Sequence, residues 1–197
     1  MRVIAGKYKG RRIDVPKGRD IRPTSDKIRG AVFNMLHSRG SIEGAHVLDA
    51  FCGSGALGIE ALSRGASSCI FVDKHRASLD CAKDNAQALG IEIEVKFWLK
   101  DSSKLGACSD YSFDLVFLDP PYHKGLVDTI LPMLVTGGWL ADGAWIVCET
   151  EKQAAINLPE KCIMDEEKTL IEFPHVDLAE AFFQAANSTK KNKNQSS

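Results

Sequence analysis

Short apolar runs alternate with amphipathic stretches along most of the chain, beginning at His46. The short runs are rich in Val, Ile, Leu and Phe and predict buried strands, while the stretches between them show helical spacing. This alternation is typical of a parallel sheet covered by helices on both faces. The predicted strands are His46–Ala50, Ser68–Val72, Glu92–Phe97, Phe113–Leu118 and Ala144–Cys148. The predicted helices are Ala56–Ser63, Arg76–Leu89 and Leu126–Leu134, with a weak helix after Ser102.

The first forty residues follow a different pattern. Residues 1–15 carry short apolar pieces around two glycines and predict a small hairpin studded with basic side chains. A helix capped by Thr24 or Ser25 follows and is expected to end near Gly40. Its predicted apolar stripe consists of Ile28, Val32 and Met35 or Leu36.

Near the C-terminus the pattern changes again. Lys161–Met164 and Thr169–Phe173 are predicted to pair as an antiparallel hairpin, because the segment between them is too short for a crossover helix. Residues 177–186 are expected to form a short amphipathic helix. The polar, low-complexity residues that follow have nothing to bury and are expected to be disordered.

The composition is that of a soluble globular protein, with 44% hydrophobic and 26% charged residues. No apolar run is long enough to span a bilayer, and the first residues lack a hydrophobic signal core, so we expect a cytoplasmic protein without a membrane partner. The six cysteines form no C-x-x-C pair and the histidines share no ligand spacing, so no metal site is expected. A monomer is the simplest expectation.

The net charge of −1 hides a strong asymmetry between the two parts of the chain. Residues 1–40 hold eleven Lys and Arg against three Asp, a net charge of +8, which leaves −9 for the rest. Such a split indicates a segment that binds a polyanion, joined to a body that does not. A solvated basic arm is the alternative interpretation of the same charges.

The first chemical signal is the segment VLDAFCGSGALGIEAL, in which a buried strand ends in Asp49 and leads through a glycine turn into a helix. Ligands of open α/β sheets bind at the carboxyl ends of the strands, where glycines let the backbone approach them closely. Gly53, Gly55 and Gly58 also satisfy G-x-G-x-x-G, followed about twenty residues later by Asp73. Taken alone, the motif could therefore indicate a nicotinamide dinucleotide.

Charge favours a different cofactor. A carboxylate such as Asp49 would repel a pyrophosphate on this turn by about 4 kcal/mol per charge pair at an effective dielectric of 20. S-adenosylmethionine instead brings an ammonium and a sulfonium, which Asp49 can attract. Asp73 is placed to accept the ribose hydroxyls and Asp101 to reach the adenine amine, although each carboxylate could simply cap a helix or turn. The same turns add the neighbouring candidates Phe51, Ser54, Lys74 and Ser102.

The second chemical signal is Asp119-Pro120-Pro121-Tyr122, directly after a predicted strand. The amino nitrogen of a base is a poor nucleophile because its lone pair is delocalised, so an enzyme must orient it. Asp119 and the Pro120 carbonyl can accept its two hydrogens, the prolines stiffen the loop, and Tyr122 can stack on the base. A Pro-Pro turn is often only structural, but both signals on one sheet predict an amino methyltransferase that needs no metal or covalent intermediate.

From Met1 to about Phe173 the sequence resembles the RsmD family of bacterial 16S ribosomal RNA guanine-N2 methyltransferases. The likeness rests on RVIAGKYKGRRI, RPTSDKIRGAVFNML, DAFCGSGALGIEALSRGA, FVDK, FDLVFLDPPY and GWLADGAWIVCE. It implies the class I fold of methyltransferases that use S-adenosylmethionine, a Rossmann-like, doubly wound and mostly parallel seven-stranded sheet with a small basic N-terminal hairpin and helix. It carries over Asp49, Gly53, Gly55, Asp73 and Asp101 as cofactor residues and Asp119 to Tyr122 as the catalytic loop. Cys52, where such sequences more often have Ala, and the tail beyond His175 depart from the family.

The resemblance also implies a substrate and a division of the chain. The substrate would be 16S ribosomal RNA, free or within a partly assembled small subunit, methylated at the exocyclic N2 of a guanine. Residues 1–40 would form an RNA-contacting arm and helix, 41–175 the methyltransferase domain and 176–197 a C-terminal extension. Methylation of adenine N6 in DNA and a catalytically inactive ribosome assembly factor are the alternatives. The expected RNA-binding side chains are Lys7, Lys9, Arg11, Arg12 and Arg22.

Overall fold

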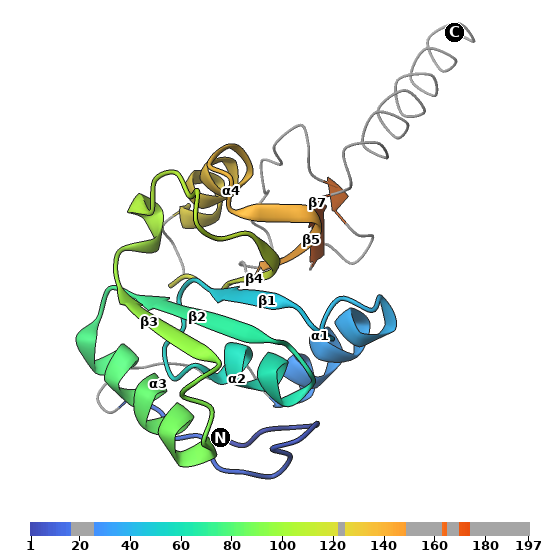
Figure 1. Ribbon diagram of the computed structural model, residues 1–197, viewed down its shortest axis with the longest axis vertical. Helices are drawn as coiled ribbons and strands as arrows, with labels where there is room; N and C mark the ends of the chain where they lie inside the picture. The colour runs from blue at the N-terminus through green and yellow to red at the C-terminus, as the bar shows by residue number, and fades with distance from the viewer. Residues whose placement is uncertain (17–25, 122–124, 149–162, 165–169, 174–197) are drawn as a thin grey trace, which may run out of the picture.

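A seven-stranded sheet forms the centre of the molecule (Figure 1). The computed structural model describes residues 1–16, 26–121, 125–148, 163–164 and 170–173. The strand order is β3-β2-β1-β4-β5-β7-β6, in which β1 to β5 are parallel and the β6–β7 pair is antiparallel. The mostly parallel sheet and its antiparallel hairpin therefore confirm the predicted fold. The strands are β1 (His46–Asp49), β2 (Ser68–Asp73), β3 (Val95–Leu99), β4 (Phe113–Leu118), β5 (Leu140–Cys148), β6 (Ile163–Met164) and β7 (Leu170–Phe173).

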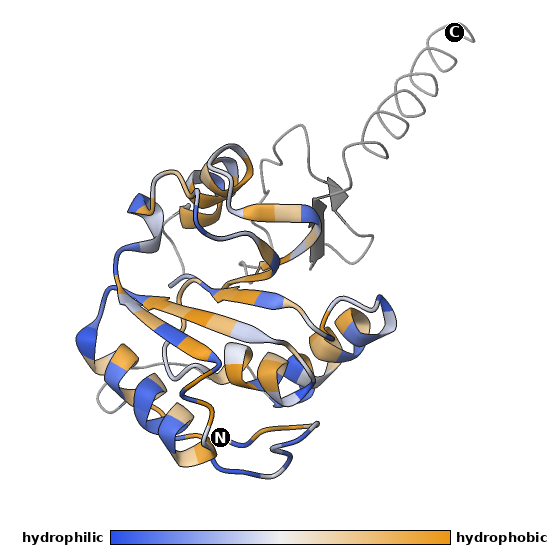
Figure 2. Ribbon diagram, in the orientation of Figure 1, coloured by the Kyte–Doolittle hydropathy of each residue, from blue (hydrophilic) through white to orange (hydrophobic). Residues whose placement is uncertain are grey.

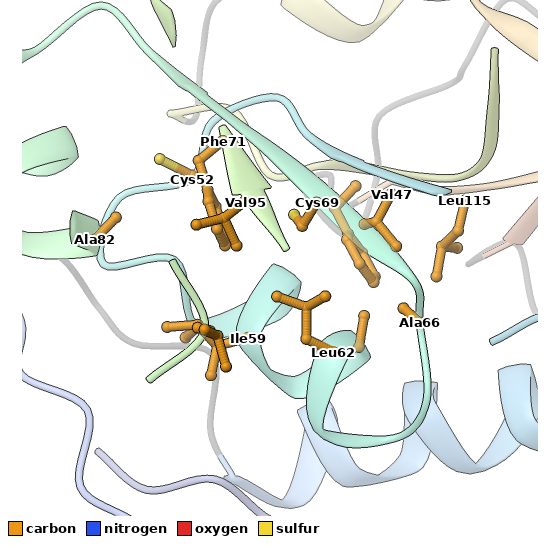
Figure 3. Close-up of a cluster of buried hydrophobic side chains, with 14 of the residues drawn as sticks. Val47, Cys52, Ile59, Leu62, Ala66, Cys69, Phe71, Ala82, Val95 and Leu115 are labelled. Atoms are coloured by element: carbon orange, nitrogen blue, oxygen red, sulfur yellow. The ribbon is translucent and has the colours of Figure 1, made fainter. Parts of the chain in front are cut away.

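Helices cover both faces of the sheet and bury two separate apolar clusters. On one face, Ile59 and Leu62 of α2 lie against Val47 and Phe71 of the sheet (Figure 3). On the other face, α4 packs on a second cluster that includes Leu48. Hydropathy follows this arrangement: the central strands are largely apolar, whereas β3 and α3 alternate between polar and apolar residues (Figure 2). The helices are α1 (Asp26–Ser38), α2 (Ala56–Ser63), α3 (Arg76–Leu89), α4 (Leu126–Thr136) and the short 3-10 helix η1 (Ser102–Lys104).

The bounds of α2, α3 and β4 agree with the prediction, but those of β3 do not. The alternating sequence of residues 92–94 resembles a strand, yet β3 begins only at Val95. Gly90 ends α3 with φ +70°, and the Glu94 N–H then donates to the Ile91 carbonyl at 3.1 Å, which closes a turn. Ile93 is fully exposed as a result, at 100% of its surface. Strand β5 also starts earlier than expected, at Leu140.

The predicted apolar stripe of α1 was wrong at its first position. Ile28 is 56% exposed, and the buried face begins instead at Arg29, which is 1% exposed. The Arg29 guanidinium donates to the Arg2 carbonyl and pairs with Asp26 at 3.1 Å. A charged side chain can occupy this buried position because the start of the chain covers it and accepts its hydrogen bonds.

Residues 1–16, called here the N-terminal arm, form the predicted hairpin. Arg2 and Arg12 make an antiparallel bridge, and the Ile13 N–H donates to the Met1 carbonyl at 2.9 Å. The arm docks onto α2 through Glu60, a fully buried carboxylate. Its two oxygens accept the N–H groups of Ile4 at 2.7 Å and Ala5 at 3.0 Å, and Arg64 balances its charge at 2.7 Å.

Gly58 sets the distance between α2 and the sheet. A Cβ at this position would lie 2.4 Å from Phe71 Cε1 and 2.5 Å from Cys69 Sγ. Since both neighbours are buried, we expect Gly58→Ala to destabilise the protein by about 1–3 kcal/mol, the usual cost of overpacking a core. Chemical denaturation of the two proteins measures this difference.

Gly30→Ala is the matched control for this change. Gly30 lies within α1, and a Cβ there would meet only Ile4 Cδ1 at 3.9 Å. Alanine has the higher helix propensity, so Gly30→Ala should raise stability by about 0.5–1 kcal/mol. Equal effects of the two substitutions would contradict this account of Gly58.

Candidate active site

Four carboxylates gather at one edge of the sheet. Asp49 ends β1 and Asp73 ends β2, while Asp101 follows β3 and Asp119 follows β4. In the sheet register, Asp49 pairs with Phe71 of β2 on one side and with Phe117 of β4 on the other. The carboxyl ends of these strands therefore lie side by side, as the sequence predicted.

Asp49 lies at the centre of this edge and is 1% exposed. Its Oδ2 accepts the Gly58 N–H at 3.0 Å, which fixes the carboxyl group below the glycine turn. Burial, together with the nearby charges of Asp119 and Asp73, raises the pKa of Asp49 to about 7. A positively charged ligand beside Asp49 would relieve this repulsion, so the site favours a cation.

The glycine turn between β1 and α2 leaves space above the site. Gly53 has φ +54° and Gly55 has φ +79°, a region that residues with a Cβ rarely adopt. Gly55 is pressed against the core, since a Cβ there would lie 3.2 Å from both Ala82 and Phe71. A Cβ on Gly53 would meet nothing within 4 Å. This turn thus offers a small-molecule ligand an open approach to the backbone, which fits the predicted cofactor.

Asp73 ties the glycine turn to the start of α3. It is buried, and its two oxygens accept the N–H groups of Gly53 at 3.2 Å and His75 at 2.8 Å. Each carboxylate oxygen has a second lone pair, so these bonds leave capacity for the two hydroxyls of a ribose. Contact with the ribose stays a prediction for Asp73.

Asp101 caps η1, which was the alternative interpretation of this residue. Its Oδ1 accepts the Ser103 N–H at 3.0 Å and the Ser103 hydroxyl at 2.7 Å. These bonds to Ser103, with smaller contributions from Lys74 and Lys104, lower the pKa of Asp101. The carboxyl group is therefore an ionised acceptor beside the site, and its contact with adenine stays a prediction.

The remaining cofactor candidates have different surroundings. Ser102 is buried and its hydroxyl donates to the Ala50 carbonyl, so it joins η1 to the end of β1. Ser54 is buried within the glycine turn, and Phe51 is partly buried against the second apolar cluster. Lys74 is exposed at the end of β2. Hence Ser102 stabilises the carboxyl ends of the strands, while the exposed Lys74 side chain lies at the border of the site and can face a ligand.

The predicted catalytic loop starts at the centre of the same edge. Asp119 is partly exposed and lies close enough to Asp49 to raise its pKa. Pro120 is buried and Pro121 is exposed. Tyr122 lies outside the described residues. The structure therefore brings the first residues of the loop to the carboxylates of the cofactor candidates.

Asn85 on α3 was missed by the sequence analysis. It is 4% exposed, and its side chain donates to the Ser54 carbonyl at 2.9 Å and to the Asp14 carbonyl at 2.9 Å. It also accepts the Asp14 N–H at 2.8 Å. Asn85 thus joins the N-terminal arm to the glycine turn. A polar residue on the apolar stripe of a predicted helix was the signal that could have found it, and the same holds for Glu60 within α2.

The basic side chains of the arm lie away from the carboxylates. The hairpin tip contacts the end of α2, where the Lys7 N–H donates to the Ser63 carbonyl at 2.7 Å. Arg11 donates to the Ala88 carbonyl at 2.6 Å, near the end of α3. Both helices start at the carboxyl edge of the sheet and run back, so these contacts lie toward the opposite edge (Figure 1). Lys9 and Arg12 are exposed on the same hairpin, and Arg22 lies outside the described residues.

Within the described part of the chain, no helix is long and apolar enough to cross a membrane. No group of three His, Cys, Asp or Glu residues there could hold a metal ion. Within the same ranges, five cysteines form no disulfide: Cys52, Cys69, Cys81, Cys108 and Cys148.

The strand order, the glycine turn and the carboxylates at the strand ends together define the class I methyltransferase fold. The family model described as "Conserved hypothetical protein 95" matches residues 1–171, and the chain belongs to this family. "Ribosomal RNA small subunit methyltransferase D" of Haemophilus influenzae is 36% identical over 172 residues, which cover 86% of this chain and 88% of that protein. Its Escherichia coli (strain K12) namesake is 36% identical over 151 residues, 77% of this chain and 75% of that one.

A solved structure supports the same assignment. The chain in "Putative methyltransferase yhhF from Escherichia coli" is 31% identical to this chain and superimposes with a TM-score of 0.79. The match covers 88% of this chain and 98% of that chain. The family match to residues 1–171 includes the arm and the carboxylate edge, and the predicted membership of the family is confirmed.

Proposed function

We propose that the protein transfers a methyl group from S-adenosylmethionine to the exocyclic N2 of a guanine in small-subunit ribosomal RNA. The observation that carries this proposal is the position of Asp119 and Pro120 beside Asp49 on one sheet edge. The relatives named ribosomal RNA small subunit methyltransferase D support the substrate class. Such a substrate would place the activity in the cytoplasm.

The cofactor would supply an electrophilic methyl group on a sulfonium. Asp49 favours its positive charge, Gly53 leaves room for it, and Asp73 and Asp101 offer acceptors for its hydroxyls and amine. These four residues fit the predicted cofactor on geometry and charge. Lys74 at the rim can contact its outer polar groups.

Asp119 and Pro120 would act on the base. The Asp119 carboxylate and the Pro120 carbonyl accept the two hydrogens of the amino group, which turns the nitrogen toward the methyl carbon. Asp119 then accepts the proton that the nitrogen loses, so the product amine is neutral. Buried Pro120 holds its carbonyl in a fixed direction, and much of the rate comes from this alignment.

The test is methyl transfer from labelled S-adenosylmethionine to undermethylated small subunits, free 16S ribosomal RNA and DNA, followed by nucleoside analysis. We expect N2-methylguanosine in ribosomal RNA. Label in DNA adenine would show a different substrate, and tight cofactor binding without any transfer would point to an inactive assembly factor.

The N-terminal arm and α1 would hold the RNA, and the rest of the chain would carry out the chemistry. Because the arm contacts the ends of α2 and α3 away from Asp119, it would touch RNA at a distance from the target base. Reversing the charge of Arg11 and Arg12 should weaken RNA binding and reduce its salt dependence by roughly 0.7–0.9 log units for each phosphate that the arm no longer neutralises. Filter binding at several salt concentrations measures the slope, and an unchanged slope would assign the arm another role.

A further inference from the structure

Strand β3 is an edge strand and carries basic and aromatic side chains on one face. Lys96 and Trp98 occupy alternate positions of the strand, so they point to the same side of the sheet. Lys100 follows the end of the strand, and its amine lies over the Trp98 ring. Both lysines are exposed, and Trp98 is partly exposed. The six segments on which the family resemblance rests do not include this strand.

Both lysines lie over aromatic rings. Lys96 Nζ is 3.1 Å from the Tyr111 hydroxyl and 5.0 Å from the centre of its ring. Lys100 Nζ is 5.1 Å from the Trp98 ring, and Trp98 meets Tyr111 edge-on with 5.3 Å between ring centres. We call Lys96, Trp98, Lys100 and Tyr111 the β3 stripe. It combines a stacking surface with positive charge, the combination that single-stranded nucleic acid requires.

The β3 stripe ends beside the active site, on the face of the sheet opposite the N-terminal arm. Trp98 and Tyr111 pack against the second apolar cluster, whereas Val3 and Ile13 of the arm belong to the first. At the start of β3, the Glu94 carbonyl accepts the Cys69 N–H at 2.9 Å, and Glu94 lies near the arm's Lys7. At the other end, β3 leads directly to Asp101 at the carboxyl edge. The stripe therefore leads toward the cofactor candidates along the face of the sheet that the arm does not cover.

We propose that the β3 stripe binds an unpaired segment of the substrate RNA, with a base stacked on Trp98 and phosphates paired to Lys96 and Lys100. The proposal rests on the function proposed above. Stacking of a base on an aromatic side chain strengthens binding roughly 5- to 150-fold, whereas a lysine over an exposed ring contributes roughly 2- to 5-fold. A base therefore displaces the Lys100 amine from Trp98, and the amine becomes available to a phosphate.

The experiment compares the parent with the double variant Lys96→Gln/Lys100→Gln. Dissociation constants for unmodified 16S ribosomal RNA are measured at several salt concentrations, alongside S-adenosylmethionine binding and methyl transfer. Removal of two lysine–phosphate pairs should weaken RNA binding at least tenfold at low salt and lower the salt slope by roughly 1.4–1.8. Cofactor affinity should not change. Trp98→Phe, which keeps a ring in the cluster, should weaken RNA binding several-fold.

Lys83→Gln is the matched control, because Lys83 lies 5.8 Å over Phe97 on the opposite face of the same strand. An equal loss of affinity in this variant would show a general effect of charge and overturn the proposal. If the parent methylates ribosomal RNA and the double variant binds it with the same affinity and slope, the β3 stripe does not bind the substrate while the function stands. If the parent methylates no RNA, the proposed function is wrong, and so is the proposal that the β3 stripe binds the substrate.

Discussion

Asp119→Ala should lower the rate of methyl transfer by roughly a thousandfold while the protein still binds S-adenosylmethionine. The substitution removes both the acceptor that orients the amino group and the group that takes its proton, and such acid–base contributions amount to about 10²–10⁴-fold. Removing Asp119 also removes one of the charges that act on Asp49, so cofactor affinity should stay the same or rise. Single-turnover transfer and calorimetric cofactor binding measure the two effects.

Asp84→Ala is a suitable control for this change, since Asp84 is an exposed acid on α3. It should transfer methyl groups at the parental rate. Substantial activity in Asp119→Ala would remove Asp119 from the mechanism. Loss of cofactor binding in that variant would instead assign Asp119 to the cofactor site.

Cofactor affinity should rise with pH below neutrality. Burial, together with Asp119 and Asp73, raises the pKa of Asp49 to about 7, so at pH 5 most of the cofactor-free protein carries a neutral carboxyl group there. A cationic ligand prefers the ionised form, which predicts an increase in affinity on the order of 50-fold between pH 5 and pH 7. Calorimetry over this range stays below the pH at which the cofactor's amino group loses its proton. Asp49→Asn should flatten the profile, and an equally steep profile in that variant would assign the titration to another group.

The stability of the cofactor-free protein should change with pH in the opposite sense. A carboxyl group with a raised pKa takes up a proton on folding between its unfolded value of 3.8 and its folded value of about 7. Below pH 4 the Asp49 carboxyl group is neutral and its burial costs little. As the pH rises toward 7, the free energy of unfolding decreases by at most about 4 kcal/mol. Denaturation at pH 8 should therefore find Asp49→Asn more stable than the parent. Equal stability would contradict the raised pKa.

Periodicity and turn chemistry were sufficient to predict the sheet and most helices. Buried strands such as β4 have continuous apolar runs, and Gly53 and Gly55 mark a turn that other residues would strain. The carboxylate edge followed from these strands, because parallel strands end side by side. The sequence could not decide whether Asp101 caps a helix or contacts the cofactor, since a carboxylate at this position can do both.

The remaining errors arose where tertiary contacts outweigh local pattern. Ile93 alternates with acids as in a strand, but the Gly90 turn exposes it. Arg29 replaces Ile28 on the buried face of α1 because the Arg2 carbonyl accepts its hydrogen bond. Arg2 is distant in sequence, so the local pattern of α1 does not reveal this contact. Asn85 was missed for the same reason: both of its partner segments are distant in sequence.

The buried carboxylate of Glu60 has a consequence for any attempt to exchange arms between enzymes of this family. Without Ile4 and Ala5, the charge of Glu60 would lose two N–H donors, although its ion pair with Arg64 would remain. Such a loss around a buried charge costs several kcal/mol, a large part of the stability of a typical domain. A transplanted arm must therefore be moved together with α2, the helix that receives it, because the two fold as one unit.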